Sequence, residues 1–122
     1  MATITPVTEE QLAGSTSPAG TSRITWGPIA LGDVCLPVHY HSHADRSVQV
    51  VGTFGVGGTM VVEGSLDETN FATLNDPQGV ALSITSAKVK AVSEMTTVIR
   101  PRISAGDGST AITVTLICRR QP

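Results

Sequence analysis

Short runs in which apolar and polar residues alternate fill most of the chain after Arg23, and they restrict its fold more than any other feature. The clearest run, residues 110–118, alternates two sets of side chains: Ile112, Val114 and Leu116 against Thr113, Thr115 and Ile117. Successive side chains of a strand point to opposite faces, so such a run has one apolar face. Threonine, valine and isoleucine also fit a pleated strand better than a helix. The pattern predicts half-buried β-strands.

Turn residues separate the runs at intervals of about 8–12 residues, the spacing of an all-β domain. We predict strands within residues 24–26, 29–31, 34–36, 38–43, 47–54, 59–64, 71–74, 80–85, 96–104 and 110–118. Residues 87–94 are ambiguous, because Val89 and Val92 suit a helical turn whereas Val89, Ala91 and Ser93 suit a strand. About eight short antiparallel strands without a convincing helix indicate a β-sandwich, a jelly roll or a small barrel.

The most regular pair of runs lies on either side of Gly55-Val56-Gly57-Gly58. Glycine can supply the positive backbone torsions of a tight reversal, so we predict a β-hairpin over Ser47–Ser65. Pro101 lies inside the run 96–104 and has no N–H for a strand ladder. It therefore predicts a sheet edge or a bulge at that position.

The first 22 residues have two prolines, two glycines and little apolar periodicity. Alone they bury too little surface to offset the entropy of ordering them. We predict an extended N-terminal arm over residues 1–22, for which a neighbouring subunit is the expected ordering surface. Residues 23–122 form the β-sandwich domain, since 122 residues suit one domain.

The charge balance argues against nucleic acid as a partner, because the net charge is −2 and the pI is about 5.8. Four arginines are interpreted as a solvated face or an ion-pairing rim: Arg100, Arg102, Arg119 and Arg120. A signal peptide and an apolar run of about 20 residues are both lacking, so we expect no membrane contact and synthesis in a reducing cytoplasm. Cys35 and Cys118 are then expected to be buried free thiols, with a single bridge as the alternative.

One cluster of metal-binding residue types occurs, at His39, His41 and His43. On a strand these three imidazoles would project from one face, about 6.6 Å apart, as the start of a zinc or copper site. Asp45 is the nearby carboxylate. We favour the alternative of a polar strand or loop at a subunit contact, so the cluster is a weak metal candidate and no cofactor is expected.

Nucleophile and base arrangements are not recognisable, because the chain lacks a Gly-x-Ser-x-Gly elbow and all its histidines lie in one cluster. The acidic residues of the turn-rich segments are interpreted as serving backbone geometry or solubility: Asp67, Glu68, Asp76 and Asp107. Trp26, Phe54 and Phe71 are predicted to be core residues, since a carbohydrate or single-strand stacking surface uses several exposed rings. We therefore expect a non-enzymatic protein without catalytic residues.

Four stretches, covering residues 52–65, 67–74, 99–102 and 105–116, carry a resemblance to a known group. They read Gly-Thr-Phe-Gly-Val-Gly-Gly-Thr-Met-Val-Val-Glu-Gly-Ser, Asp-Glu-Thr-Asn-Phe-Ala-Thr-Leu, Ile-Arg-Pro-Arg and Ala-Gly-Asp-Gly-Ser-Thr-Ala-Ile-Thr-Val-Thr-Leu. Together they resemble small virion proteins of tailed bacteriophages, a group commonly encoded near the major capsid protein. Some members of that group resemble capsid decoration, or cement, proteins. The resemblance extends over about residues 48–120.

This resemblance implies a jelly-roll-like β-sandwich on the capsid surface of a virion, made in the host cytoplasm. The implied function is to stabilise contacts between major capsid protein subunits, and no catalytic residue comes with it. The implied partners are the major capsid protein and further copies of the chain, in a homodimer or a homotrimer. Two alternatives stay open: a head–tail connector or tail component, and a carbohydrate- or metal-binding β-sandwich module.

Overall fold

The computed structural model describes residues 2–9, 21–40, 43 and 45–119. Every regular element among them is a strand: β1 (Thr3–Ile4), β2 (Val7–Glu9), β3 (Thr21–Ile29), β4 (Val34–Cys35), β5 (Asp45–Thr53), β6 (Thr59–Ser65), β7 (Ala72–Thr73), β8 (Ser83–Ile84), β9 (Lys88–Ala91), β10 (Val98–Ala105) and β11 (Ala111–Arg119). The predicted all-β class is confirmed. More strands are present than the eight or so predicted: β1 and β2 lie in the predicted arm, where we predict no strand, whereas β4, β7 and β8 lie within predicted runs.

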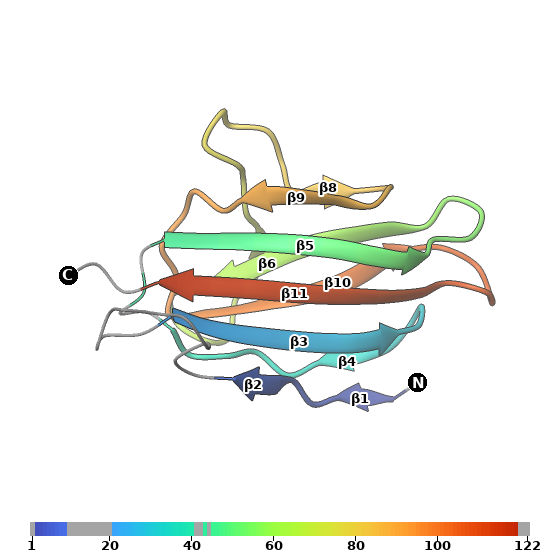
Figure 1. The fold of residues 1–122 in the computed structure, drawn as a ribbon, viewed down its shortest axis with the longest axis horizontal. Helices are drawn as coiled ribbons and strands as arrows, with labels where there is room; N and C mark the ends of the chain where they lie inside the picture. The colour runs from blue at the N-terminus through green and yellow to red at the C-terminus, as the bar shows by residue number, and fades with distance from the viewer. Residues whose placement is uncertain (1, 10–20, 41–42, 44, 120–122) are drawn as a thin grey trace.

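Two sheets form the layers of a sandwich (Figure 1). The larger sheet has the order β2–β3–β11–β5–β9 with antiparallel neighbours throughout. The smaller sheet lies behind it in Figure 1, with β6 paired to β10 along one edge and to β7 and β8 along the other. A short parallel pair, β1 with β4, completes the described pairings. The predicted β-sandwich is confirmed.

Side chains from the facing surfaces of the two sheets form the core. On β11, Ile112, Val114 and Leu116 are at most 1% exposed, while the threonines between them are half-buried on the outer surface. Met60 and Val62 of β6 belong to the same buried cluster. Burial of a large apolar side chain contributes about 1.5–3 kcal/mol, so this cluster is a main source of the stability of the fold.

The aromatic residues only partly follow the prediction. Trp26 is 1% exposed, and its indole N–H donates a hydrogen bond of 2.8 Å to the carbonyl of Leu36. Phe54 is half-buried and packs against the core. For Phe71 the prediction is wrong: its half-buried ring lies outside the core, 3.7 Å from the guanidinium of Arg100. An aromatic face attracts a cation, and composition alone does not reveal that alternative to burial.

The predicted hairpin over Ser47–Ser65 is wrong, although both of its strands exist. β5 pairs with β11 and β9, whereas β6 pairs with strands of the other sheet, so residues 54–58 carry the chain from one sheet to the other. Alternating strands joined by glycines are compatible both with a hairpin and with a connection between two sheets. The choice depends on partners far along the chain, and the local pattern contains no information about them.

Three further strand predictions have clear outcomes. Residues 88–91 form β9, which resolves the ambiguous segment as a strand. Pro101 lies on β10, which ends the strand order of the smaller sheet, as predicted for a proline. Pro101 itself is in register with Val62, and a register shift lies farther along, between Ile103 and Ala105. The predicted strand over residues 38–43 is wrong for its described residues: among 38–40 and 43, only Val38 makes a β-bridge, and the N–H of His43 donates a bond of 3.0 Å to the carbonyl of Tyr40.

The described part of the predicted N-terminal arm lies along the sandwich of its own chain. β1 runs parallel to β4, with the Ala2 and Ile4 carbonyls accepting bonds of 2.8 and 3.0 Å from Val34 and Leu36. β2 pairs with residues 23–25 of β3. Residues 10–20 of the arm lie outside the described residues, and β3 begins at Thr21.

Both cysteines are free and buried, as predicted. Burial raises the pKa of each thiol to about 11, which keeps both groups protonated and unreactive near neutral pH. Within the described residues, no helix has the length and hydropathy of a membrane span.

Candidate functional site

The structure gives the two described histidines of the metal candidate different surroundings. His39 is exposed, and its Nε2 lies 2.6 Å from Oε1 of Glu68. His43 is 7% exposed, and its ring meets the ring of Tyr40 edge to face at 5.0 Å. His41 lies outside the described residues. In the part of the chain that the structure does describe, no three His, Cys, Asp or Glu side chains are grouped to hold a metal ion.

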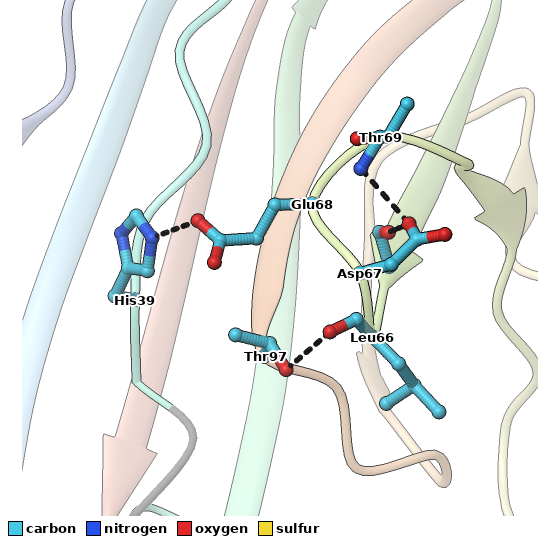
Figure 2. Close-up of polar contacts among 7 residues, drawn as sticks. His39, Leu66, Asp67, Glu68, Thr69 and Thr97 are labelled. Atoms are coloured by element: carbon cyan, nitrogen blue, oxygen red, sulfur yellow. Dashed lines mark hydrogen bonds and ion pairs between the residues drawn. The ribbon is translucent and has the colours of Figure 1, made fainter.

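The contact of His39 with Glu68 belongs to a tightly bonded turn at the end of β6 (Figure 2). Oδ1 of Asp67 accepts hydrogen bonds of 2.8 to 2.9 Å from the Ser65 hydroxyl and from the N–H groups of Thr69 and Asn70. Its Oδ2 accepts one of 2.7 Å from the Asn70 side chain. These bonds hold the pKa of Asp67 well below its usual range, and the bond from the Asn70 N–H has the largest effect. Asp67 therefore serves backbone geometry, as predicted.

Glu68 has a different role from the one predicted for it. Its φ of +66° is rare for a residue with a side chain, and it follows from the turn that Asp67 imposes. In Figure 2 the Glu68 side chain crosses β10 to reach His39 on the connection after β4. The neighbouring Leu66 is fixed as well, because its carbonyl accepts a 2.9 Å bond from the hydroxyl of Thr97. The turn is thus anchored on two other segments.

This turn forms one side of a groove of about 400 Å³ at the end of the smaller sheet, which we call the end groove. Its lining residues are Gly64, Ser65, Leu66, Asp67, Asn70, Ala72, Leu74, Glu94, Met95 and Thr96. Two apolar side chains project from it: Leu66 is 73% exposed and Met95 is 45% exposed. The segment that carries Met95 is also fixed, because the carboxylate of the preceding residue, Glu94, accepts two bonds of 2.7 Å from the backbone and side chain of Asn75.

The end groove is absent from the sequence predictions for a physical reason. Leu66 stands alone in a polar turn, and Met95 lies in a segment without regular structure, so neither belongs to an alternating run. A leucine placed next to an aspartate that caps a turn is a signal that could have indicated an exposed apolar tip.

Asp76 and Asp107 also confirm the role predicted for turn carboxylates. Asp76 accepts bonds from the N–H groups of Gln78 and Val80. Asp107 joins the two connections at the opposite end of the sandwich: it accepts bonds from the Ser109 N–H and hydroxyl, and one of 2.9 Å from the N–H of Val56. The hydroxyl of Ser109, followed by the N–H of Val56, lowers the pKa of Asp107 from 3.8 to about 2.

These carboxylates give the fold a predicted dependence on pH. The pKa values of five of them are lowered by hydrogen bonds made in the folded chain: Asp33, Asp67, Asp76, Glu94 and Asp107. A lowered pKa adds stability above the unfolded value and loses it as the pH falls through the folded value. We expect the contribution of these carboxylates to the free energy of unfolding to be complete above about pH 5 and to fall from about pH 4 to pH 2.

Asp107→Asn provides the matched test of this pH dependence by urea unfolding. The variant keeps the size of the side chain but removes the charge, so it should be less stable than the wild type at pH 7. The difference should shrink toward pH 2, where the wild-type carboxylate takes up its proton. A difference that stays constant across this range contradicts the assigned role.

A buried arginine holds the segment before β5. Arg46 is 4% exposed, and its guanidinium donates to four acceptors at 2.8 to 3.1 Å: the carbonyls of Tyr40, His43 and Thr96, and the hydroxyl of Thr96. Burial lowers the pKa of this guanidinium. Each of these hydrogen bonds goes to the backbone or side chain of a residue outside the regular strands. We therefore assign Arg46 a structural role.

Three of the four clustered arginines form ion pairs, as predicted, but they lie on two different sheets and form no shared rim. On the outer surface of the smaller sheet, Arg100 and Arg102 donate to the two oxygens of Glu63 at 3.2 and 2.9 Å. Arg119 reaches Asp45 at 2.6 Å on the larger sheet. Arg120 lies outside the described residues.

The outer surface of the larger sheet, which we call the open face, carries two ion pairs, Arg23 with Glu9 and Arg119 with Asp45. It faces the viewer in Figure 1, where no described element covers it. Strand pairing aligns its central row across all five strands: Val7, Thr25, Thr115, Gln49 and Val89. A hollow of about 580 Å³ lies at one end of this face, lined in part by Ser47, Ala91 and Ile117.

Comparison with known proteins gives no further guide to these surfaces: no protein-family model, curated protein or solved structure matches the chain.

Proposed function

We propose that this protein is a non-enzymatic structural protein of a tailed-bacteriophage virion. In this proposal it binds the outside of the capsid as a decoration, or cement, protein and stabilises contacts between major capsid protein subunits. The end groove is the observation that carries the proposal, because it offers a partner protein an apolar site held in a fixed geometry.

The geometry of the end groove suits docking to another protein. Leu66 and Met95 present apolar side chains at 73% and 45% exposure, on segments already fastened by Asp67, Thr97 and Glu94. Apolar anchors seated in pockets account for most of the affinity of protein interfaces. Binding through fixed loops loses little conformational entropy, so a small contact can contribute usefully to affinity. Many such contacts on one shell act together through multivalency.

The strand order supports the proposal at the level of architecture. The larger sheet contains β3–β11–β5–β9, and the smaller one contains Val38, β10, β6 and β8 in that order. From β3 to β11 the chain changes sheet at every step except from β6 to β8. We infer from this order that the sandwich is a jelly roll, an architecture used by viral capsid domains.

Binding to shells tests the proposed function directly. Purified protein is mixed with shells assembled without it, and the pelleted ratio to the major capsid protein is measured on gels. We expect saturation at many copies per shell and a higher melting temperature of the decorated shell. Binding of only a handful of copies, or none, contradicts the decoration role, and a handful at one vertex favours a connector or tail component.

A pair of variants tests whether the end groove makes the contact. Leu66→Asp places a charge on the groove and should weaken shell binding by about tenfold or more. Val56→Asp is the matched control, because Val56 is 82% exposed in a turn fastened by Asp107 at the opposite end of the sandwich. Equal binding by both variants shows that the shell contacts another surface.

A further inference from the structure

The open face has an internal symmetry that suits contact with a second copy of the chain. Its central row begins with Val7 on β2 and ends with Val89 on β9, and Thr115 stands at its midpoint on β11. Val7 is 71% exposed and Val89 is 64% exposed, so the two terminal side chains of the row are exposed valines. A surface whose two ends carry the same chemistry can match itself after a half-turn.

We propose that two copies of this chain pair through their open faces around a two-fold axis that runs along β11. In this arrangement Val7 of one copy meets Val89 of the second copy, and the reverse contact forms on the other side of the axis. Thr25 lies opposite Gln49, and Thr115 lies opposite its own equivalent. The exposed apolar side chains of the row are thus buried against each other, with hydroxyl and amide groups between them.

The charges on the open face are compatible with this pairing. In the row next to the central one, Arg23 is paired with Glu9 of the same chain at 2.8 Å. In the dimer, Arg23 faces Ser47 of the second copy and Glu9 faces Ala91 of the second copy. Both of these facing residues are uncharged. At the end of β11, Arg119 is paired with Asp45 of its own copy. Because β11 lies on the axis, Arg119 faces its own equivalent in the second copy, and its ion pair with Asp45 reduces the like-charge repulsion there.

The size of the open face is sufficient for a specific contact. β3, β5 and β11 have nine residues each, while β2 and β9 have three and four. At about 3.3 Å per residue and about 4.8 Å between strands, these strands cover roughly 500 Å² in each copy. The pair buries about 1,000 Å² in total, the lower limit for a specific interface, so we expect a dissociation constant on the order of micromolar.

This pairing goes beyond the proposed function, because it is a property of the isolated protein. A two-fold axis parallel to the strands keeps the strand directions of both copies the same. The two end grooves therefore lie at the same end of the dimer, and both can contact one surface. The dimer would bind a shell at two points, which raises its apparent affinity without any new contact.

Sedimentation equilibrium of the purified chain at concentrations up to about 100 µM tests the pairing. We expect a monomer–dimer equilibrium for the wild type. Thr115→Arg places two like charges together on the axis and should weaken dimerisation by about tenfold or more. Ser83→Arg is the control, because Ser83 is exposed on β8 of the smaller sheet, and it should dimerise like the wild type.

A cysteine on the axis tests the symmetry itself. Facing sheets lie about 10 Å apart, which is too far for a direct disulfide. A bismaleimide cross-linker that spans about 10 Å should therefore join Thr115→Cys to its own equivalent, whereas it should not join Ser83→Cys; the native thiols are buried. A monomeric wild type, a trimer, or a dimer that Thr115→Cys does not cross-link overturns the proposal. If the wild type is a monomer and Thr115→Arg abolishes its binding to shells, the open face contacts the shell and the pairing proposal is wrong. Leu66→Asp should remain dimeric, so failure of the docking proposal is distinguishable from failure of this one.

Discussion

Replacing Arg46 by alanine is expected to lower the free energy of unfolding by about 3–5 kcal/mol, one of the two largest effects that we expect of a single substitution in this chain. The side chain is 4% exposed, and its removal takes a hydrogen-bond donor from the carbonyls of Tyr40, His43 and Thr96, of which the Tyr40 carbonyl keeps the bond from the His43 N–H. A buried acceptor that loses its partner retains the full cost of its desolvation. The cavity left by the side chain adds to that cost.

Urea unfolding of two further variants separates this effect from a general loss of charge. Arg46→Lys keeps the charge but has one nitrogen in place of the three-nitrogen fork, so it should lose about half as much stability. Arg23→Ala removes an arginine whose side chain is 45% exposed in its pair with Glu9, and it should cost less than about 1 kcal/mol. A loss below about 1 kcal/mol for Arg46→Ala contradicts its role as the anchor of this segment.

The second large effect is expected at Gly58, in the connection between β5 and β6. A Cβ at this position would overlap the carbonyl oxygen of Phe54 and lie 2.5 Å from its carbonyl carbon. The backbone of Phe54 cannot retreat easily, because its carbonyl oxygen accepts a 2.8 Å bond from the hydroxyl of Thr110. Gly58→Ala should therefore lower the free energy of unfolding by about 3 kcal/mol or more.

Gly57 provides a control in the same turn. Its φ is +70°, but a Cβ there would meet nothing within 4 Å. Gly57→Ala introduces only left-handed strain and should cost about 1 kcal/mol. Thermal unfolding of the two variants measures the difference, and similar losses would contradict a steric origin of the effect at Gly58.

The strands and turns of this fold were predictable where local chemistry determines them. On β11, the alternation of Val114 and Leu116 with threonines fixes which side faces the core, because the side-chain period of a strand is two. Asp67 and Asp107 were predictable as turn residues, since a short carboxylate reaches the N–H groups that follow it.

The pairing of the strands could not be predicted in the same way. Residues 47–54 and 59–65 look like a hairpin, yet β5 takes β11 as its neighbour and β6 takes β10. Each pair joins residues at least 33 positions apart along the chain, and the energy of that contact comes from packing rather than local propensity. The end groove depends on the same long-range packing, which brings Met95 beside Leu66.

Arg46 is a residue whose burial the sequence pattern could have indicated. Arg46 lies two and four residues before Val48 and Val50, so the alternation of β5 places all three side chains on the inward face of the strand. An inward arginine in an otherwise apolar face indicates a buried hydrogen-bonded anchor. Alternation carries no such signal for β1, β4, β7 and β8, because two residues each give no period.

The position of β11 has a consequence for how the protein is made. This strand lies at the centre of the larger sheet, between β3 and β5, yet it is the last of the described strands to be synthesised. Until residues 111–119 leave the ribosome, β3 and β5 each have an unpaired edge that can capture another nascent chain. Folding must therefore wait for the end of β11 and form contacts of long sequence separation, which is slow. We expect chains truncated before β11 to aggregate, and chaperone demand during synthesis to exceed that of a helical protein of equal length.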